Sequence, residues 1–227
     1  MKLFPITVFI LGLISTFLPA QTTNPAPATP VAPAAAPAPA FRKDPFSDPL
    51  IKQVQARHQK AVDGDTKETK ALTADLEKWT KQQPNNHLLQ VYLGSAYTLC
   101  SRDAWIGPGK LTYLQNGGKT MDAAVTADPN NPAVRFVRAI NYFSLPAIFG
   151  KRQTARDDFQ LLLKQIEGTV KTPYTLNVET RQAIYYYAGL SFKQLDQDKQ
   201  AKEAWTSGLK LNPASPLGVK IQAKLKD

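Results

Sequence analysis

The sequence predicts an all-α domain behind a proline-rich leader, and three observations carry that prediction. From Phe41 onward, apolar residues recur with a period near 3.6, without convincing strand alternation. Two segments shifted by 45 residues align without gaps. Ten of the 18 prolines fall within the first 50 residues, so the residue that most strongly interrupts helices is concentrated ahead of the helical pattern.

Residues 1–20 have the layout of a secretory signal peptide. Lys2 precedes an almost entirely apolar run that ends at Ala20. Leu18 stands three positions before the expected cleavage point, where a small residue is preferred, so an uncleaved anchor stays open as the alternative. The single cysteine, Cys100, lies far from this segment, which excludes a lipoprotein. We expect a periplasmic or extracellular protein, with membrane contact only if the signal is retained.

Residues 21–41 are expected to form a disordered tether. Fourteen of the twenty residues from 21 to 40 are Ala or Pro, and none is charged. Proline at this density blocks both helix and sheet and favours an extended chain. The helical domain is therefore assigned to 42–227, which is long enough to bury a sizeable core.

The helical pattern divides into nine segments. They are predicted near 47–61, 67–82, 87–101, 114–127, 132–144, 152–167, 178–195, 198–211 and 215–226. The internal repeat aligns PNNHLLQVYLGSAY at 84–97 with PNNPAVRFVRAINY at 129–142. In both copies the proline ends one helix, and the asparagines are expected to cap the next by accepting from its free N–H groups.

The last repeat unit is the best formed. Its small residues, aromatics and proline occupy positions 8, 11, 20, 24, 27 and 32 of a 34-residue unit, in the order Gly189, Phe192, Ala201, Trp205, Gly208 and Pro213. Tyr185 supplies an aromatic at position 4. On these residues the chain resembles the tetratricopeptide repeat (TPR) family, whose pattern places small residues at 8, 20 and 27, aromatics at 11 and 24, and proline at 32.

The earlier units depart from this pattern through two insertions. The first, at 101–118, adds about eleven residues, and the second, at 144–152, adds about four. Residues 47–84 form a degenerate first pair, and the helix predicted at 215–226 resembles a terminal cap. The resemblance covers roughly 47–213 and implies a right-handed solenoid of helix–turn–helix repeats with a C-terminal capping helix.

In the family, four positions on the first helix of each unit line a concave groove that binds protein or peptide partners. The resemblance carries these positions onto Leu88, Val91, Ser95, Thr98, Ala133, Phe136, Ile140, Phe143, Ala183, Tyr186, Leu190 and Lys193. Such a groove is apolar and aromatic, which suits an amphipathic helix or an extended peptide. The implied function is that of an exported adaptor in the cell envelope.

One charged residue stands where the repeat pattern expects a packed face. Arg138 aligns with Leu93 and Ala188, and a charge there must be paired or must open onto a cavity. An ion pair with Asp157 or Asp158 is one alternative, and a site for an anionic ligand beside the two insertions is the other. The candidate residues for that ligand site are Arg102, Trp105, Arg135, Arg138, Lys151 and Arg152.

The insertions also leave a second function open. If the segments 101–118 and 144–152 enclose a pocket, the protein would bind a small solute or serve as a component associated with a transporter. The net charge of +10 is spread along the chain without a concentrated basic block, so we expect no nucleic-acid partner.

No catalytic, cofactor or metal site is predicted. The segment NGGKT at 116–120 lacks both the first glycine of a phosphate-binding loop and the preceding strand. Cys100 is expected to be a buried core residue, while His58 and His87 are expected at the surface. We therefore expect a protein that is not an enzyme and has no cofactor.

Overall fold

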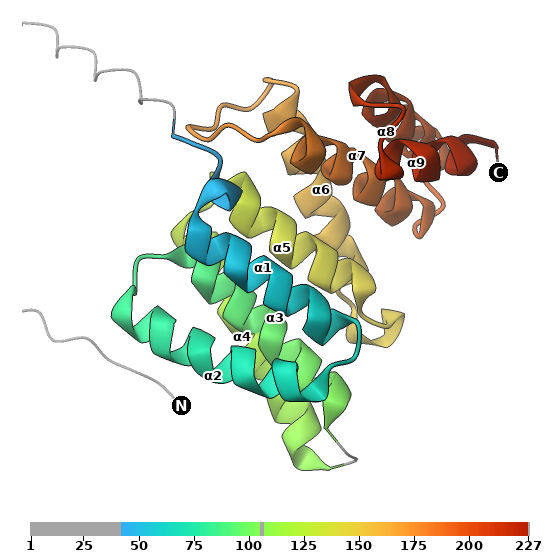
Figure 1. Ribbon diagram of the computed structural model, residues 1–227. Coiled ribbons are helices and arrows are strands. Elements are labelled where there is room, and N and C mark those ends of the chain that lie inside the picture. Colours follow the sequence, from blue (N-terminus) through green and yellow to red (C-terminus); the bar gives the residue numbers. More distant parts are fainter. Residues whose placement is uncertain (1–41, 105–106, 227) are drawn as a thin grey trace, which may run out of the picture. The chain divides into compact units, whose positions relative to one another are not determined.

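The computed structural model describes residues 42–104 and 107–226, and the prediction of an all-α domain is confirmed for them (Figure 1). The α-helices are α1 Pro49–Val62, α2 Thr66–Gln82, α3 His87–Asp103, α4 Pro108–Ala127, α5 Pro132–Ser144, α6 Arg152–Ile166, α7 Val178–Lys193, α8 Asp198–Leu211 and α9 Pro216–Lys226. Two short 3-10 helices, η1 Pro45–Ser47 and η2 Ala147–Phe149, precede α1 and α6. The signal peptide and tether predicted for 1–41 lie outside the described residues.

The predicted asparagine caps are present at both copies of the repeated segment. The Asn86 side chain accepts from the backbone N–H of Leu89 at 3.2 Å and starts α3. The Asn131 side chain accepts from the backbone N–H of Ala133 at 3.0 Å and starts α5. Each asparagine thus satisfies a backbone donor that has no partner within its helix.

The prediction for the start of α4 is wrong. A break was expected up to residue 114, but the helix begins at Pro108, so much of the first insertion is helical. Proline fits the first helical position because it lacks the N–H that would be unpaired there. Gly117 does not interrupt the helix; a Cβ on it would lie 2.7 Å from the carbonyl oxygen of Gly94 in α3. The glycines therefore mark a close crossing of two helices.

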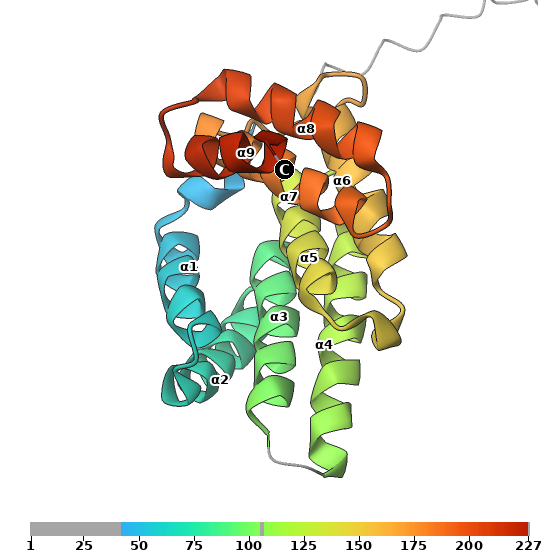
Figure 2. The ribbon, with the colours of Figure 1, turned by 90° about the vertical axis from the view of Figure 1, so that its right-hand side faces the viewer.

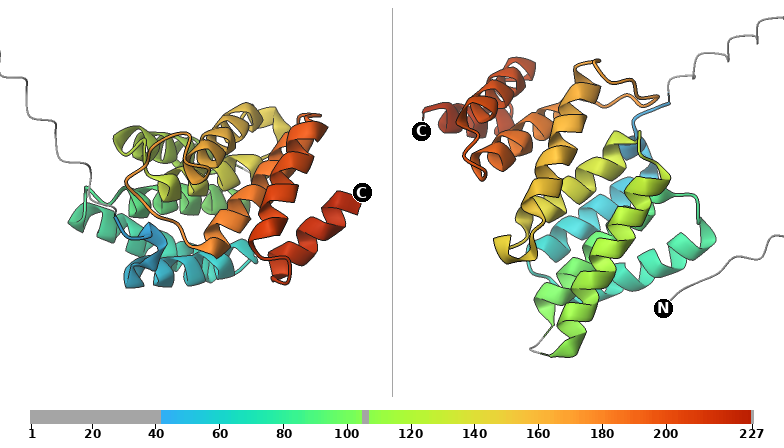
Figure 3. Two further views of the ribbon diagram at one scale, coloured as in Figure 1. Left: turned by 90° about the horizontal axis from the view of Figure 1, so that it is seen from above. Right: turned by 180° about the vertical axis from the view of Figure 1, so that it is seen from behind.

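Each helix from α1 to α9 packs against the next one along the chain. In addition, α3 contacts α1 and α5, while α7 contacts α5 and α9. Figure 2 shows α1, α3 and α5 side by side, and Figure 3 shows the α7–α9 part from above and from behind. One cluster of buried side chains extends from Phe46 beside α1 to Ile221 in α9, so these helices share a core.

The last helix pair packs through the small and aromatic residues that the sequence singles out. A Cβ on Gly189 of α7 would lie 2.5 Å from Cδ1 and Cε2 of Trp205 in α8. A Cβ on Gly208 would lie 2.7 Å from Cβ of Tyr185. Trp205 is 4% exposed, and its indole N–H donates to the backbone carbonyl of Tyr186 at 3.1 Å. Glycine at these two positions is therefore required for the aromatic rings to fit.

Within the described residues, no helix is sufficiently long and apolar to span a bilayer.

Candidate functional site

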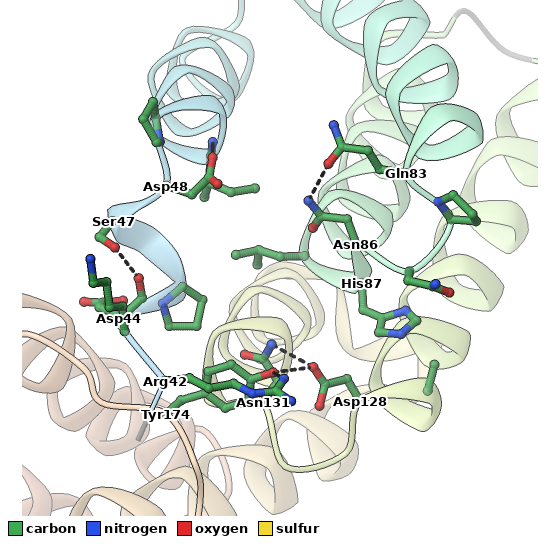
Figure 4. Close-up of a pocket in the computed structure, with 18 residues that line it drawn as sticks. Arg42, Asp44, Ser47, Asp48, Gln83, Asn86, His87, Asp128, Asn131 and Tyr174 are labelled. Atoms are coloured by element: carbon green, nitrogen blue, oxygen red, sulfur yellow. Dashed lines mark hydrogen bonds between the residues drawn. The ribbon is translucent and has the colours of Figure 1, made fainter. Parts of the chain in front are cut away.

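A cavity of about 980 Å³ opens beside the first residues of α1 and α3 (Figure 4). Arg42 and Tyr174 form one side of it, and the Arg42 guanidinium donates to the Tyr174 hydroxyl at 3.0 Å. Asp128 lies nearby and accepts from the Tyr174 hydroxyl at 3.0 Å. Asp48 lies at the start of α1, across the cavity from Asn86 at the start of α3.

The polar groups of this cavity already serve the fold. The Asp48 carboxylate caps α1 by accepting from the backbone N–H of Leu50 at 2.8 Å. Asp44 accepts from the backbone N–H groups of Phe46 at 2.9 Å and Asn177 at 3.0 Å. These bonds join the first described segment to the α6–α7 connection. The cavity is thus a polar junction between segments, and we assign it no chemistry.

The predicted groove positions on α3 are enclosed. Leu88, Val91, Ser95 and Thr98 are buried, because α3 lies between α1 and α5. The Ser95 hydroxyl meets His58 Nε2 of α1 at 2.8 Å and accepts from the Asn141 amide of α5 at 3.1 Å. The same amide donates to the Thr98 hydroxyl at 2.7 Å. Side chains of the neighbouring helices therefore occupy this part of the predicted groove.

On α5 and α7 the predicted groove becomes progressively more open. Ala133 and Phe136 are buried, whereas Ile140, Phe143, Ala183, Tyr186 and Leu190 are half-buried and Lys193 is exposed. Tyr187 joins the two helices through edge-on aromatic contacts with Phe136 and Phe143, both with ring centroids 6.3 Å apart. Tyr187 was not among the predicted groove residues, although its place in the run of three tyrosines at 185–187 signals an aromatic surface.

A hollow of about 580 Å³ follows this open part, and we call it the α7 groove. Its lining residues are Phe143, Leu190, Lys193, Gln194, Asp198, Ala201, Lys202, Trp205 and Lys224. Three of the predicted groove positions therefore meet here, beside residues of α8 and α9 that the groove prediction did not include. The lining combines apolar side chains with three lysines.

The candidate ligand residues on α5 form a buried ion network. Arg138 donates to both oxygens of Asp158, at 2.8 and 2.7 Å, and Arg135 donates to Asp158 at 2.6 Å. Burial alone would lower the pKa of Arg138, but the bonds to Asp158 and the nearby Asp122 carboxylate outweigh it and raise that pKa. The ion-pair alternative predicted for Arg138 is present, with Asp158 as the partner.

The other candidate ligand residues lie in different surroundings. Arg102 donates to the backbone carbonyls of Ala61 and Val62, at 2.7 and 2.9 Å, and so caps the end of α1. Arg152 is the half-buried first residue of α6. Trp105 lies outside the described residues. Arg102 is thus engaged with the end of α1, away from the carboxylates that hold Arg135 and Arg138.

Lys151, the remaining candidate, joins the ion network through Asp122. Its ammonium lies 3.7 Å from Asp122 Oδ2 and 4.5 Å from the centroid of the Tyr142 ring. Asp122 also accepts from Arg138 at 3.0 Å and from the Tyr142 hydroxyl at 2.7 Å. Asp122 was not predicted as a site residue; its position four residues after Gly118, on the face toward α5, is the only signal for it.

A second hollow, of about 310 Å³, lies against this network between the two insertions, and we call it the α4 pocket. Its lining residues are Thr98, Leu111, Leu114, Gln115, Gly118, Lys119, Asp122, Tyr142, Leu145, Phe149 and Lys151. The first insertion contributes residues from successive turns of α4, and the second insertion contributes residues on either side of and within η2. The pocket combines apolar walls with cations on one side.

The remaining reactive side chains are held in structural contacts. The Cys100 sulfur lies 3.3 Å from the Thr73 hydroxyl, and burial raises the pKa of this half-buried thiol. The expectation that His58 is a surface residue is wrong, because its ring packs edge-on against Tyr92 with centroids 5.4 Å apart. Burial and the nearby Arg102 lower the pKa of His58 to about 4. His87 is half-buried and bonds to Gln90 at 2.9 Å.

Over 42–104 and 107–226, no group of three or more His, Cys, Asp or Glu side chains is arranged to hold a metal ion.

A scan against protein-family models finds no matching family, and searches among curated proteins and solved structures find no significant match.

Proposed function

We propose that this protein is an adaptor that binds a protein or peptide partner through the α7 groove. The observation that carries the proposal is the apolar floor of Phe143, Leu190 and Trp205 in a hollow of about 580 Å³. An exposed apolar hollow on a folded domain is a place where a partner removes hydrophobic surface from water. The amphipathic helix or extended peptide expected from the sequence suits the apolar residues of this lining.

The charges around the groove indicate the chemistry of the partner. Three lysines, Lys193, Lys202 and Lys224, line the hollow, and one carboxylate, Asp198, lies among them. The Lys193 ammonium bonds to Asp198 at 2.6 Å, so Lys202 is the lysine left to meet an acidic group of a partner. We expect a partner segment with apolar anchors and flanking carboxylates, because opposite charge speeds encounter and excludes basic competitors.

We also propose that the helices form a right-handed, TPR-like stack capped by α9. Two features support this arrangement. Successive helices pack in order, and the first helices of successive pairs touch each other, as stacked repeats require. In the last pair, Gly189 faces Trp205 and Gly208 faces Tyr185, which are the small-to-aromatic contacts that the family pattern implies.

The adaptor proposal is tested by comparing two lysine reversals on one helix. Lys202→Glu changes an exposed residue of the α7 groove, whereas Lys210→Glu changes an exposed residue of α8 outside it. Immobilised wild-type protein and the Lys210→Glu variant should retain the same protein from an envelope extract, and Lys202→Glu should lose it. Leu190→Ala should weaken binding of the purified partner in calorimetry, because it removes an apolar anchor point. Equal retention by all variants would contradict the groove as the binding surface.

Export to the periplasm or the outside is part of the same proposal. It rests on the apolar run within residues 1–20 and on the Ala/Pro-rich segment after it. Cell fractionation followed by mass measurement of the purified chain tests it. A chain shortened by its first 20 residues in the exported fraction would support a cleaved signal, whereas a full-length cytosolic chain would contradict export.

A second candidate function, the binding of a small solute, is favoured by the α4 pocket. This pocket of about 310 Å³ falls between the two insertions that the repeat pattern does not require. Ligand pockets in proteins begin at about 300 Å³, so its size suits a small molecule. A thermal-shift screen of the protein against small metabolites tests this function. Stabilisation by a single class of compound would support it.

A further inference from the structure

The walls of the α4 pocket expose apolar surface to water. Leu111 is 55% exposed and Phe149 is 42% exposed, and both line the pocket. On the same two segments, Tyr113 is 40% exposed and Ile148 is 88% exposed. These four are a majority of the seven large hydrophobic residues exposed in the described part of the chain. Such a concentration of exposed apolar side chains marks a surface that something covers.

The lining of the pocket also contains two cations, Lys119 and Lys151. The Lys151 ammonium is held over the Tyr142 ring, 4.5 Å from its centroid, and 3.7 Å from Asp122 Oδ2. The Asp122 carboxylate is shared, since it also accepts from Arg138 and from the Tyr142 hydroxyl. Lys119 lines the pocket as well. One carboxylate therefore serves several donors, and it cannot neutralise all of them.

A count over the whole ion network and the pocket lining shows an excess of positive charge. The two carboxylates are Asp122 and Asp158, and the four cations are Arg135, Arg138, Lys119 and Lys151. The network and the pocket lining together therefore carry two more positive than negative charges. The two arginines pair with Asp158, and the charged residues that line the pocket are Lys119, Lys151 and Asp122, which leaves one surplus positive charge there. A bound anion would reduce the repulsion among these cations.

We infer that the α4 pocket binds a small monocarboxylate with a short apolar tail, of which octanoate is a simple example. The carboxylate pairs with Lys151, and the tail lies between Leu111 and Phe149, where it covers exposed apolar surface. This inference rests on the second function proposed above and names the class of solute. The volume of about 310 Å³ limits the tail to a short one.

Calorimetric titration of the full chain with four probes tests the two halves of this ligand. Octanoate carries both the anion and the tail, acetate carries the anion alone, octanol carries the tail without a charge, and octylammonium reverses the charge. We expect octanoate to bind at least tenfold more tightly than each of the other three, because only octanoate meets both walls. Equal binding of octylammonium would overturn the inference.

Two pairs of variants locate the site. Lys151→Met removes the ammonium in the pocket, and Lys110→Met removes an exposed lysine of α4 that does not line it. Leu111→Gln removes an exposed apolar wall, and Val219→Gln makes the same kind of change on α9, where Val219 is 59% exposed. Octanoate affinity should fall at least tenfold in the first member of each pair and stay unchanged in the second. Unchanged affinity in both pocket variants would overturn the assignment.

A spectroscopic readout separates the two proposals from each other. Gly118 lines the pocket, so the NMR resonance of its backbone amide should shift during the octanoate titration. Octanoate could leave this resonance unchanged while another solute from the metabolite screen shifts it. That result would contradict the carboxylate inference and support the solute-binding function. If no solute shifts this resonance, both the carboxylate inference and the solute-binding function are contradicted.

Discussion

Arg138 and Asp158 form a two-point ion pair in the interior, with donors Nε and Nη2 at 2.8 and 2.7 Å from the two carboxylate oxygens. The Asp158 side chain is 2% exposed, and the Arg138 side chain is 11% exposed. A second arginine, Arg135, donates to the same carboxylate at 2.6 Å. One buried carboxylate thus holds two guanidinium groups, and it joins α5 to α6.

Removing that carboxylate should strongly destabilise the fold. Asp158→Ala leaves Arg135 and Arg138 partly buried without their shared counter-charge, and breaking a buried pair in this way costs about 3–5 kcal/mol of unfolding free energy. Arg138→Met should cost less, because Arg135 still pairs with Asp158. Urea unfolding measures both. The control is Asp157→Ala, a 57% exposed neighbour on the same helix, which should change stability by less than about 0.5 kcal/mol.

The contact between Gly189 and Trp205 should not tolerate a methyl group. A Cβ at position 189 would meet the indole at distances that real side chains do not adopt, so Gly189→Ala should lower the unfolding free energy by about 1–3 kcal/mol. Thermal unfolding provides the measurement. Gly109→Ala is the matched control in the first turn of α4, where a Cβ meets nothing within 4 Å, and it should be neutral or stabilising.

His58 should make stability depend on pH. Its folded-state pKa is about 4, against 6.5 for the free side chain, so the unfolded chain binds more protons between these values. The stability that is present above pH 6.5 is therefore lost as the pH falls toward 4, by on the order of 3 kcal/mol in total. Unfolding measured at several pH values should show a shallower decline for His58→Gln. Parallel curves for the two proteins would contradict a neutral, half-buried imidazole in the folded state.

Cys100 should react slowly with thiol reagents. Burial raises its pKa, although the bond to Thr73 opposes that effect, so little thiolate is present near neutral pH. At pH 8, modification of the folded protein by a disulfide reagent should be at least severalfold slower than modification of the urea-unfolded chain. A folded-state rate equal to the unfolded rate would show that the thiol is neither shielded nor shifted.

Helix positions and ends followed from local patterns. The predicted segments 132–144 and 198–211 coincide with α5 and α8, because an apolar period of 3.6 and flanking helix-ending residues are local properties. The capping roles of Asn86 and Asn131 were predictable for the same reason. Local pattern was insufficient at the start of α4, where the predicted segment begins at 114 but the helix begins at Pro108, because Gly107, Pro108 and Gly109 are residues that usually interrupt helices.

The partners of charged residues were predictable only in part. The pairing of Arg138 with an aspartate of α6 was expected because an arginine on a packed face requires a counter-charge. The position of Asp122 between Arg138 and Lys151 could not be predicted, because it depends on how α4 and α5 pack against each other. The enclosure of Ser95 between α1 and α5 was equally outside the reach of local patterns.

By itself the sequence determined the helical class, the caps, the small-to-aromatic contacts of the last pair and the need to pair Arg138. The tertiary structure alone decided which face of each helix remains open, because exposure depends on helices distant in sequence. Packing of α3 between α1 and α5 encloses the four groove positions predicted on α3, while α7 keeps Leu190 and Lys193 accessible. The extension of α4 to Pro108 brings Leu111 into the lining of the α4 pocket, together with Phe149 from the second insertion.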